Sequence, residues 1–327
     1  EGRKAKRAAR AILSSASASR LTEFAIKNPE YIGEIVAVKF AVDDDIDSFL
    51  RGFIARETPE SDRRVNDQTI EFVDRLNQAS LISYEFSDYL FTGSASRDAE
   101  IAGIKGALIG SIWTLGVCLL IAFPLGVATA VYLEEIAPKN RMTEIIEINI
   151  NNLAAVPSVV FGIMGLAIFI IVFGLPRSIP LVGGIVLALM TLPTIIISSR
   201  AAIRAVPPSI RDAALGVGAS KMQTILHHVI PPAMPGMLTG TIIGMAQALG
   251  ETAPLLMIGM VAFIVDVPGG VMEPATALPV QIFMWADFAE RMFIQKTSAA
   301  IIVLLAFLIT MNAGAIILRK KLERRWQ

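Results

Sequence analysis

Five long apolar segments constrain the fold of this chain more than any other feature. Each has about twenty or more mainly apolar residues, which at about 1.5 Å per helical residue crosses a hydrocarbon core of roughly 30 Å. Hydrophobic residues make up 54% of the 327 residues and are concentrated in these segments. The pattern predicts an all-α polytopic membrane protein. The expected spans are residues 104–133, 150–173, 180–199, 236–265 and 298–318.

The first hundred residues contain no segment long enough to cross a membrane. They combine a β-rich stretch, EIVAVKFAV, with a helix-like stretch, TIEFVDRLNQASLISYEF. We therefore expect residues 1–100 to form a small mixed α/β domain that faces water, and residues 101–327 to form the transmembrane domain. Asp43, Asp45 and Asp47 have the spacing of a calcium loop, but Ser48 and Ile54 stand where that loop needs Gly and Glu. We expect a solvated acidic turn there and no metal site.

Basic residues follow the first, third and fifth apolar segments. If the spans alternate in direction, all of these residues lie on one side, and the positive-inside rule makes that side cytoplasmic. The segment 200–235 is then cytoplasmic and residues 1–100 are extracytoplasmic. Because such an N-terminal domain needs an anchor, we expect a further helix upstream of Glu1. The basic residues are Lys139 and Arg141, then Arg200, Arg204, Arg211 and Lys221, and finally Arg319, Lys320, Lys321, Arg324 and Arg325.

The segment after the third span carries a spaced pattern of small residues. Asp212, Ala213 and Ala214 are followed by Gly218 four residues later and by Pro231 at the end of the segment. This resembles the EAA loop of ABC-importer permeases, with Asp in place of the usual Glu. We expect two short helices that turn near Gly218 and dock an ATPase chain. The alternative is an ordinary cytoplasmic loop.

Glycine recurs at a four-residue interval in the fourth span, at Gly236, Gly240 and Gly244. Residues four apart share a helix face, and such a stripe permits close approach of another helix in lipid. We expect the stripe to pack within one helix bundle, and a contact with a partner permease is the alternative.

A lone carboxylate, Glu251, lies about 22 Å along the helix from Gly236 and so within the bilayer. An intramembrane acid faces a polar cavity or pairs with another charge. Gln247 lies one turn earlier on the same face, and Pro254 favours a kink beside Glu251. We hypothesise that Glu251, Gln247 and Thr252 line a substrate path. The alternative is that Glu251 only braces the kink or a subunit contact.

Three further stretches resemble one family closely. These are FPLGVATAVYLEE, LAAVPSVVFG and GETAPLL, at residues 123–135, 153–162 and 250–256. Together they resemble the PstA-type permeases of bacterial phosphate ABC importers, over about residues 103–318. The resemblance implies a type I ABC-importer permease fold, and the N-terminal region resembles the extra domain of longer members. Many relatives carry Arg where this chain has Gln247, which would shift anion attraction to the partner permease or to Arg200 and Arg204.

The resemblance also implies the partners of the chain. They are a second, PstC-like permease, two PstB-like ATP-binding subunits and a periplasmic, PstS-like phosphate-binding protein. No G-x-x-x-x-G-K-[ST] motif occurs in the chain, so we expect no cofactor here and expect ATP and Mg on the ATPase. The net charge of zero disfavours nucleic-acid binding.

The sequence thus predicts a non-catalytic permease subunit of an ATP-driven phosphate importer in the bacterial inner membrane. One alternative is a permease for another oxyanion, such as molybdate or sulfate, or for an organic solute. A channel or an ion-driven carrier is a second alternative, although such carriers place more charges within their spans. A membrane enzyme is disfavoured because the spans contain no paired carboxylates, zinc motif or Ser/Lys set.

Overall fold

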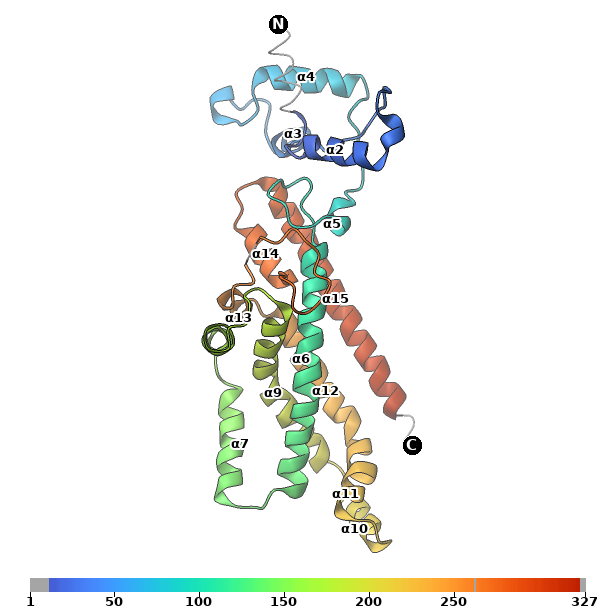
Figure 1. The fold of residues 1–327 in the computed structure, drawn as a ribbon, viewed down its shortest axis with the longest axis vertical. Helices are drawn as coiled ribbons and strands as arrows, with labels where there is room; N and C mark the ends of the chain where they lie inside the picture. The colour runs from blue at the N-terminus through green and yellow to red at the C-terminus, as the bar shows by residue number, and fades with distance from the viewer. Residues whose placement is uncertain (1–11, 262, 324–327) are drawn as a thin grey trace. The chain divides into compact units, whose positions relative to one another are not determined.

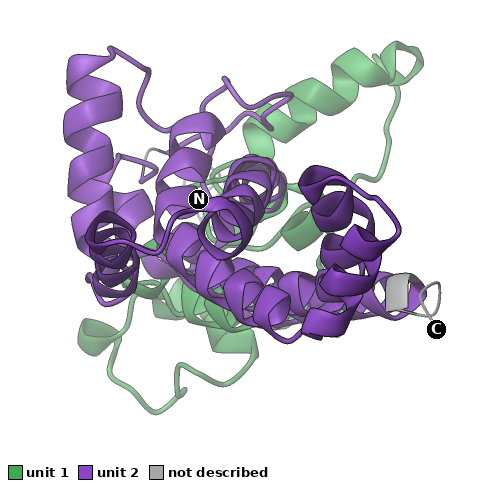
Figure 2. Ribbon diagram, turned by 90° about the horizontal axis from the view of Figure 1, so that it is seen from below, with its two compact units in different colours: residues 1–105, 284–299 green, residues 106–283, 300–327 purple. Residues whose placement is uncertain are grey.

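The computed structural model describes residues 12–261 and 263–323. The chain divides into two compact units, coloured separately in Figure 2. Unit 1 comprises residues 1–105 and 284–299, and unit 2 comprises residues 106–283 and 300–327. The described residues are helices joined by loops, which confirms the prediction of an all-α membrane protein.

The N-terminal region is helical rather than mixed α/β. The β-rich stretch EIVAVKFAV lacks sheet partners, and the one bridge in the described residues joins Leu13 to Val42 in antiparallel fashion. Continuing that ladder would pair the stretch with residues that follow Leu13, but helix α2 (Ser17–Lys27) begins there. A β-prone run needs a partner strand to form a sheet. The helix removes that partner, so the mixed α/β expectation is not confirmed.

Unit 1 is organised around a small apolar cluster of Ile12, Ile46, Val65 and Val73. Its elements, besides α2, are η1 (Pro29–Tyr31), α3 (Asp44–Leu50), η2 (Glu60–Asp62), α4 (Asp67–Gln78) and α5 (Tyr89–Thr92). Its helices α3 and α4 begin at the capping side chains of Asp43 and Asn66, which accept hydrogen bonds from backbone amides.

Long helices dominate the rest of the chain (Figure 1). Short helices α10 and α11 lie at one end of unit 2, between the long helices α9 and α12. The elements are α6 (Lys105–Val131), the π-helical turn η3 (Tyr132–Ile136), α7 (Arg141–Leu153), α8 (Ser158–Gly165), the π-helical η4 (Leu166–Val172), α9 (Pro180–Arg204), α10 (Pro208–Gly216), α11 (Lys221–Thr224), the π-helical η5 (Ile225–Val229), α12 (Ile230–Gly250), α13 (Ala253–Met257), α14 (Leu278–Ala286) and α15 (Arg291–Glu323).

Four helices in the described residues are long and apolar enough to cross a membrane, and a bent pair provides a fifth span if it counts as one. The four are Lys105–Ile136, Pro180–Arg204, Lys221–Gly250 and Arg291–Lys321.

Two predicted spans differ from the observed helices, and proline explains both differences. The predicted span 150–173 is broken, since α7 and α8 meet at 102°. Pro157 lies at this break and disfavours a helical residue before it. The predicted span 236–265 begins earlier and ends at Gly250. Pro254 has no N–H to donate to the carbonyl of Gly250, so the chain breaks there instead of bending.

Helices α9 and α12 pack closely through the glycine stripe. A Cβ added to Gly240 would lie 1.7 Å from the Ser198 hydroxyl oxygen, and one added to Gly236 would lie 2.6 Å from the Cβ of Ala202. At Gly244 the nearest side-chain atom of α9 would be 3.6 Å away. The stripe therefore faces α9 of the same chain, and the backbones approach because glycine has no side chain.

We predict opposite effects of two Gly→Ala substitutions. Gly240→Ala forces overpacking that costs about 1–3 kcal/mol, so the thermal unfolding temperature in detergent should fall. Gly314 on α15 has no atom within 4 Å of an added Cβ. Gly314→Ala should therefore keep or raise that temperature, because Ala is favoured by about 0.5–1 kcal/mol within a helix. Ser198→Gly should relieve the loss caused by Gly240→Ala. Equal decreases in the unfolding temperature for Gly240→Ala and Gly314→Ala would contradict the close packing of α9 and α12.

Candidate functional site

The segment between α9 and α12 folds into two short helices around a glycine turn. Helix α10 ends at Gly216, and Gly218 follows with a φ of +92° that favours glycine. Nothing lies within 4 Å of a Cβ added to Gly218, so the requirement is conformational and not steric. Helix α11 then begins at a capping box between Ser220 and Gln223.

The residues of the EAA-like pattern lie on this segment. Asp212 and Ala213 are exposed on α10, whereas Ala214 is buried beneath it. Pro231 is the second residue of α12, which directly follows the π-helical η5. The structure thus brings the pattern onto one connecting segment at one end of unit 2 (Figure 1).

Apolar side chains are exposed on the same connecting segment. Val217, next to the glycine turn, is 86% exposed. A concentration of exposed apolar residues on a short polar connection is typical of a surface that contacts another chain. The other large exposed apolar residues are Ile210, Leu215, Met222 and Leu226.

An ion-pair network joins the end of α6 to α7 and α9. Arg200 Nε donates to Glu134 Oε1 at 2.5 Å, and Arg204 Nε donates to Glu134 Oε2 at 2.8 Å. Arg200 also reaches Glu147 on α7, at 2.6 Å from Nη2 to Oε1. Arg200 is only 7% exposed, and its charge is balanced by these carboxylates.

A second branch of the network holds α10. Arg211 lies on this helix, and its Nη2 and Nε donate to Glu135 Oε1 at 2.7 and 3.1 Å. The same guanidinium donates to the carbonyl oxygens of Val206 and Ile203, at 2.7 and 3.0 Å. Those carbonyls lie at the C-terminal end of α9, where backbone acceptors lack partners within the helix. One arginine thus ties α10 to the ends of both α6 and α9.

Sequence reasoning missed the roles of Glu134 and Glu135. It used Arg200 and Arg204 as candidate anion-attracting groups, but the structure pairs both with Glu134. A signal was present, because two adjacent carboxylates end the first span, and Arg200 and Arg204 lie four residues apart on one helix face.

The predicted substrate-path residues gather where α12 ends. Gln247 is exposed in the last turn of α12, and Glu251 follows in an extended conformation with φ −78° and ψ 125°. The Glu251 amide donates to the carbonyl of Ala248 at 3.3 Å. Thr252 then precedes α13, and the side chains of Glu251 and Thr252 are half-buried. The carboxylate therefore sits at a break in the helix and not within a continuous span.

Two of the sequence motifs meet beside this break. A Cβ added to Gly162 on α8 would lie 2.6 Å from Cα of Pro254 on α13. The motifs LAAVPSVVFG and GETAPLL, far apart in the sequence, thus pack backbone against backbone. This contact holds the break at Glu251 against the bent α7–α8 pair.

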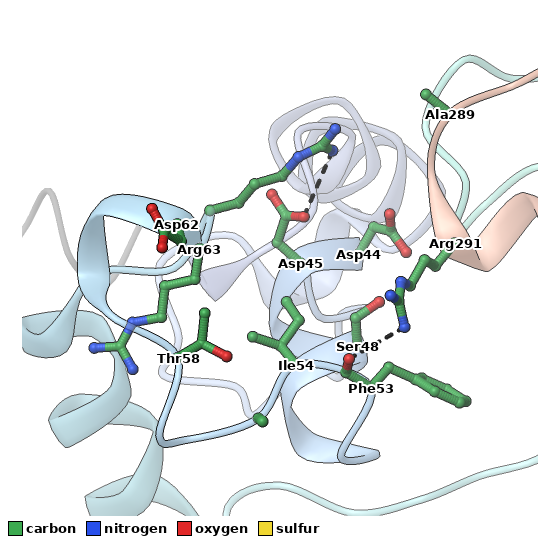
Figure 3. A pocket seen from close by; sticks show the side chains of 12 residues that line it. Asp44, Asp45, Ser48, Phe53, Ile54, Thr58, Asp62, Arg63, Ala289 and Arg291 are labelled. Carbon is green, nitrogen blue, oxygen red and sulfur yellow. Dashed lines mark hydrogen bonds and ion pairs between the residues drawn. The ribbon is translucent and has the colours of Figure 1, made fainter.

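Unit 1 contains a separate cavity of about 420 Å³ with charged walls (Figure 3). Arg291 Nη1 donates to the carbonyl oxygen of Phe53 at 3.1 Å, and Arg64 lies 3.7 Å from Asp45. Asp44 Oδ1 is buried without a hydrogen-bond partner. Burial, followed by repulsion from Asp45 and other carboxylates, raises the pKa of Asp44 to about 6.

The acidic stretch before this cavity has a structural role. The Asp43 carboxylate accepts a hydrogen bond from the Asp45 amide at 3.1 Å and caps α3. Among the residues that the structure describes, no group of three or more His, Cys, Asp or Glu side chains is arranged to hold a metal ion.

Long apolar helices, a span broken beside an acid and a connection of short helices together define a multi-pass transport permease. Residues 122–327 match the family described as the binding-protein-dependent transport system inner membrane component. The chain belongs to this family and is a multi-pass inner membrane protein. Residues 1–60 match a family described only as a domain of unknown function.

Curated relatives are permease proteins. The chain is 32% identical over 225 residues to the phosphate transport system permease protein PstA 1 of Mycobacterium tuberculosis (strain CDC 1551 / Oshkosh), covering 68% of this chain and 72% of that protein. It is 34% identical over 181 residues to the probable ABC transporter permease protein YqgI of Bacillus subtilis (strain 168), covering 55% and 60%. The chain thus matches less than two thirds of YqgI. The predicted resemblance to PstA-type permeases is confirmed.

Solved structures confirm the predicted permease fold. An inward-facing MetNI methionine ABC transporter aligns with a TM-score of 0.53 at 14% identity, covering 65% of this chain and 94% of that one. A bacterial ABC transporter involved in alginate import aligns with a TM-score of 0.52 at 14% identity, covering 92% and 99%. At such identity the likeness establishes the fold alone.

We predict a pH-dependent stability of unit 1. Because the pKa of Asp44 is raised from 3.8 to about 6 in the folded state, the folded chain binds a proton that the unfolded chain releases. The free energy of unfolding of unit 1 should therefore fall as the pH rises from about 4 through about 6. At pH 7 the free energy of unfolding of Asp44→Asn should exceed that of wild type by about 1 kcal/mol, a value reduced because Asp44 is partly exposed. At pH 4 the two free energies should be equal.

Thermal unfolding followed by a probe in unit 1 measures this difference. Asp62→Asn is the matched control, because Asp62 is an exposed carboxylate that lines the same cavity. A stabilisation by Asp44→Asn of equal size at both pH values would contradict the prediction.

Proposed function

We propose that this chain is the transmembrane permease subunit of an ATP-driven importer of inorganic phosphate. The observation that carries the proposal is the similarity to phosphate transport system permeases across about two thirds of the chain. The break at Glu251 supports it, because this break is made by the GETAPLL motif that the sequence shares with PstA-type permeases.

Energy for transport would come from another chain. In this proposal α10 and α11 are cytoplasmic and dock one of the two PstB-like ATP-binding subunits of the importer, which hold ATP and Mg. The exposed apolar residues Leu215, Val217 and Met222 provide contact area for that docking. Asp212, Ala213 and Ala214 lie on the same segment and would contribute to it.

The remaining partners lie within and outside the membrane. A PstC-like permease would complete the pathway, and a periplasmic PstS-like protein would deliver phosphate. Residues 1–100 would then be extracytoplasmic, as the distribution of basic residues predicts. Because the network neutralises Arg200 and Arg204, the positive charge that attracts phosphate would come from the partner permease.

Glu251 would act on the protonated form of the substrate. A fixed carboxylate repels the phosphate dianion, but it can accept a hydrogen bond from the hydroxyl of the monoanion. Gln247 and Thr252 carry an amide and a hydroxyl, and both groups can donate to phosphate oxygens. The break at the end of α12 frees these side chains from a continuous apolar helix.

Uptake by the reconstituted complex tests the proposed function. Proteoliposomes containing both permeases and the ATPase subunits should accumulate labelled phosphate in the presence of ATP and binding protein. Omitting the ATPase should abolish uptake. Excess unlabelled phosphate should compete, whereas sulfate and molybdate should not. Competition by molybdate or sulfate alone would assign the permease to that oxyanion instead.

We predict that Glu251→Gln separates transport from assembly. The substitution keeps the shape of the side chain and removes its charge, so phosphate uptake per assembled complex should fall by about tenfold or more, the loss expected for a charged hydrogen bond. Assembly with the partner permease should be unchanged. Glu144→Gln is the matched control, since Glu144 is an exposed carboxylate on α7. If assembly falls in step with uptake, Glu251 braces the structure; unchanged uptake per complex excludes it from translocation.

A further inference from the structure

Glu134 and Glu135 are adjacent in the sequence but hold different parts of unit 2. Glu134 pairs with Arg200 and Arg204 of α9, whereas Glu135 pairs with Arg211 of α10. Neighbouring residues on a helix point about 100° apart, so one turn of chain can reach two partners. Both carboxylates lie in the π-helical turn η3 that ends the first span. Such turns insert an extra residue and redirect the side chains that follow.

The contact between Glu135 and Arg211 is the specific connection of α10 to the first span, which consists of α6 and η3. In the part of the chain that the structure describes, no other hydrogen bond or ion pair joins α10 to this span. Both side chains are largely shielded from water, with 13% exposure for Glu135 and 22% for Arg211. Shielding strengthens a charge-assisted hydrogen bond, so this pair resists separation more than a surface pair would.

Arg211 has a fixed orientation as well as a charge partner. Its planar guanidinium is held by the Ile203 and Val206 carbonyls at the end of α9 while it meets Glu135. A displacement of α10 therefore pulls on two long helices at their ends. Asp212, the next residue on α10, is exposed.

We infer that Glu135 is a positioning residue that makes α6 follow the movement of α10. This inference rests on the proposed function, in which α10 docks an ATPase. ATP-driven displacement of α10 is transmitted through Arg211 to Glu135 and hence to the first span. Without Glu135, α10 still docks and the ATPase still works, but the first span is then joined to α10 indirectly, through Glu134 and α9, and follows its movement less closely. The loss appears as ATP hydrolysis without transport.

The first measurement is the amount of phosphate imported per ATP hydrolysed by the complete importer in proteoliposomes. Glu135→Ala should keep ATP hydrolysis within about twofold of wild type and lower the ratio about tenfold, since a charged hydrogen bond is lost. Glu135→Gln keeps an oxygen that accepts a hydrogen bond from Arg211, and this neutral bond is weaker but still forms. Its ratio of phosphate imported to ATP hydrolysed should therefore be more than about half of the wild-type ratio. Glu144→Ala should leave the ratio unchanged.

The second measurement is independent of the substrate. Spin labels at Leu120→Cys on α6 and Ser220→Cys beside α10 report the distance between the two helices. Both positions are exposed. In wild type this distance should be the same in the ATP-bound and nucleotide-free complexes, because the helices move together. In Glu135→Ala it should differ between the two states.

Several outcomes overturn the inference. An unchanged ratio in Glu135→Ala does so, as does an equal loss in Glu144→Ala. Loss of ATPase association in Glu135→Ala assigns the residue to docking and also refutes it. A label distance that is unaffected by Glu135→Ala refutes it even if the complex imports no phosphate. Absence of phosphate uptake by the wild-type complex, with the expected label distances, refutes the proposed substrate and leaves the positioning role supported.

Discussion

The close contact between α9 and α12 is the constraint on which the rest of unit 2 depends. Lipid tails are as apolar as the side chains of a helix, so moving these side chains from lipid onto a neighbouring helix gains no hydrophobic free energy. Helices in a membrane therefore associate by close packing. Gly236 and Gly240 provide it, because an added Cβ at either position would collide with α9. This contact places the end of α9 where its arginines meet the carboxylates of η3 and α7, and α13, which follows α12, packs against α8.

The charged side chains at the two ends of the α9–α12 pair differ in whether they form ion pairs. At the end near α10, Arg200, Arg204 and Arg211 are balanced by three glutamates and serve to join helices. At the other end, Glu251 has no ion pair in the described residues and sits at a helix break. Paired charges rigidify a structure, whereas an unpaired carboxylate beside a break is available to a ligand or to another subunit. The two ends are thus suited to coupling and to transport, respectively.

The proposed function and the inferred role of Glu135 combine these features. Helices α10 and α11 expose apolar surface for a partner and turn at Gly218, where the positive φ is unstrained for glycine. Arg211 connects this surface to the long helices through Glu135. Helix α12, which packs on α9, ends just before Glu251, and α13 follows with the Gly162–Pro254 contact. A continuous series of packed elements therefore runs from the docking surface to the candidate substrate path.

Local pattern determined much of this protein. Apolar runs revealed the membrane spans, the Gly218 spacing revealed the turn between short helices, and GETAPLL revealed the family, because length, periodicity and backbone freedom are properties of neighbouring residues. Only the tertiary structure decided the partners of Glu134 and Glu135, which lie 66 to 76 residues away in the sequence. It also turned the predicted kink near Pro254 into a break and left EIVAVKFAV without a sheet. A proline alone allows either a kink or a break, and a β-prone run alone allows a strand, so the outcome depends in each case on which other segment packs alongside.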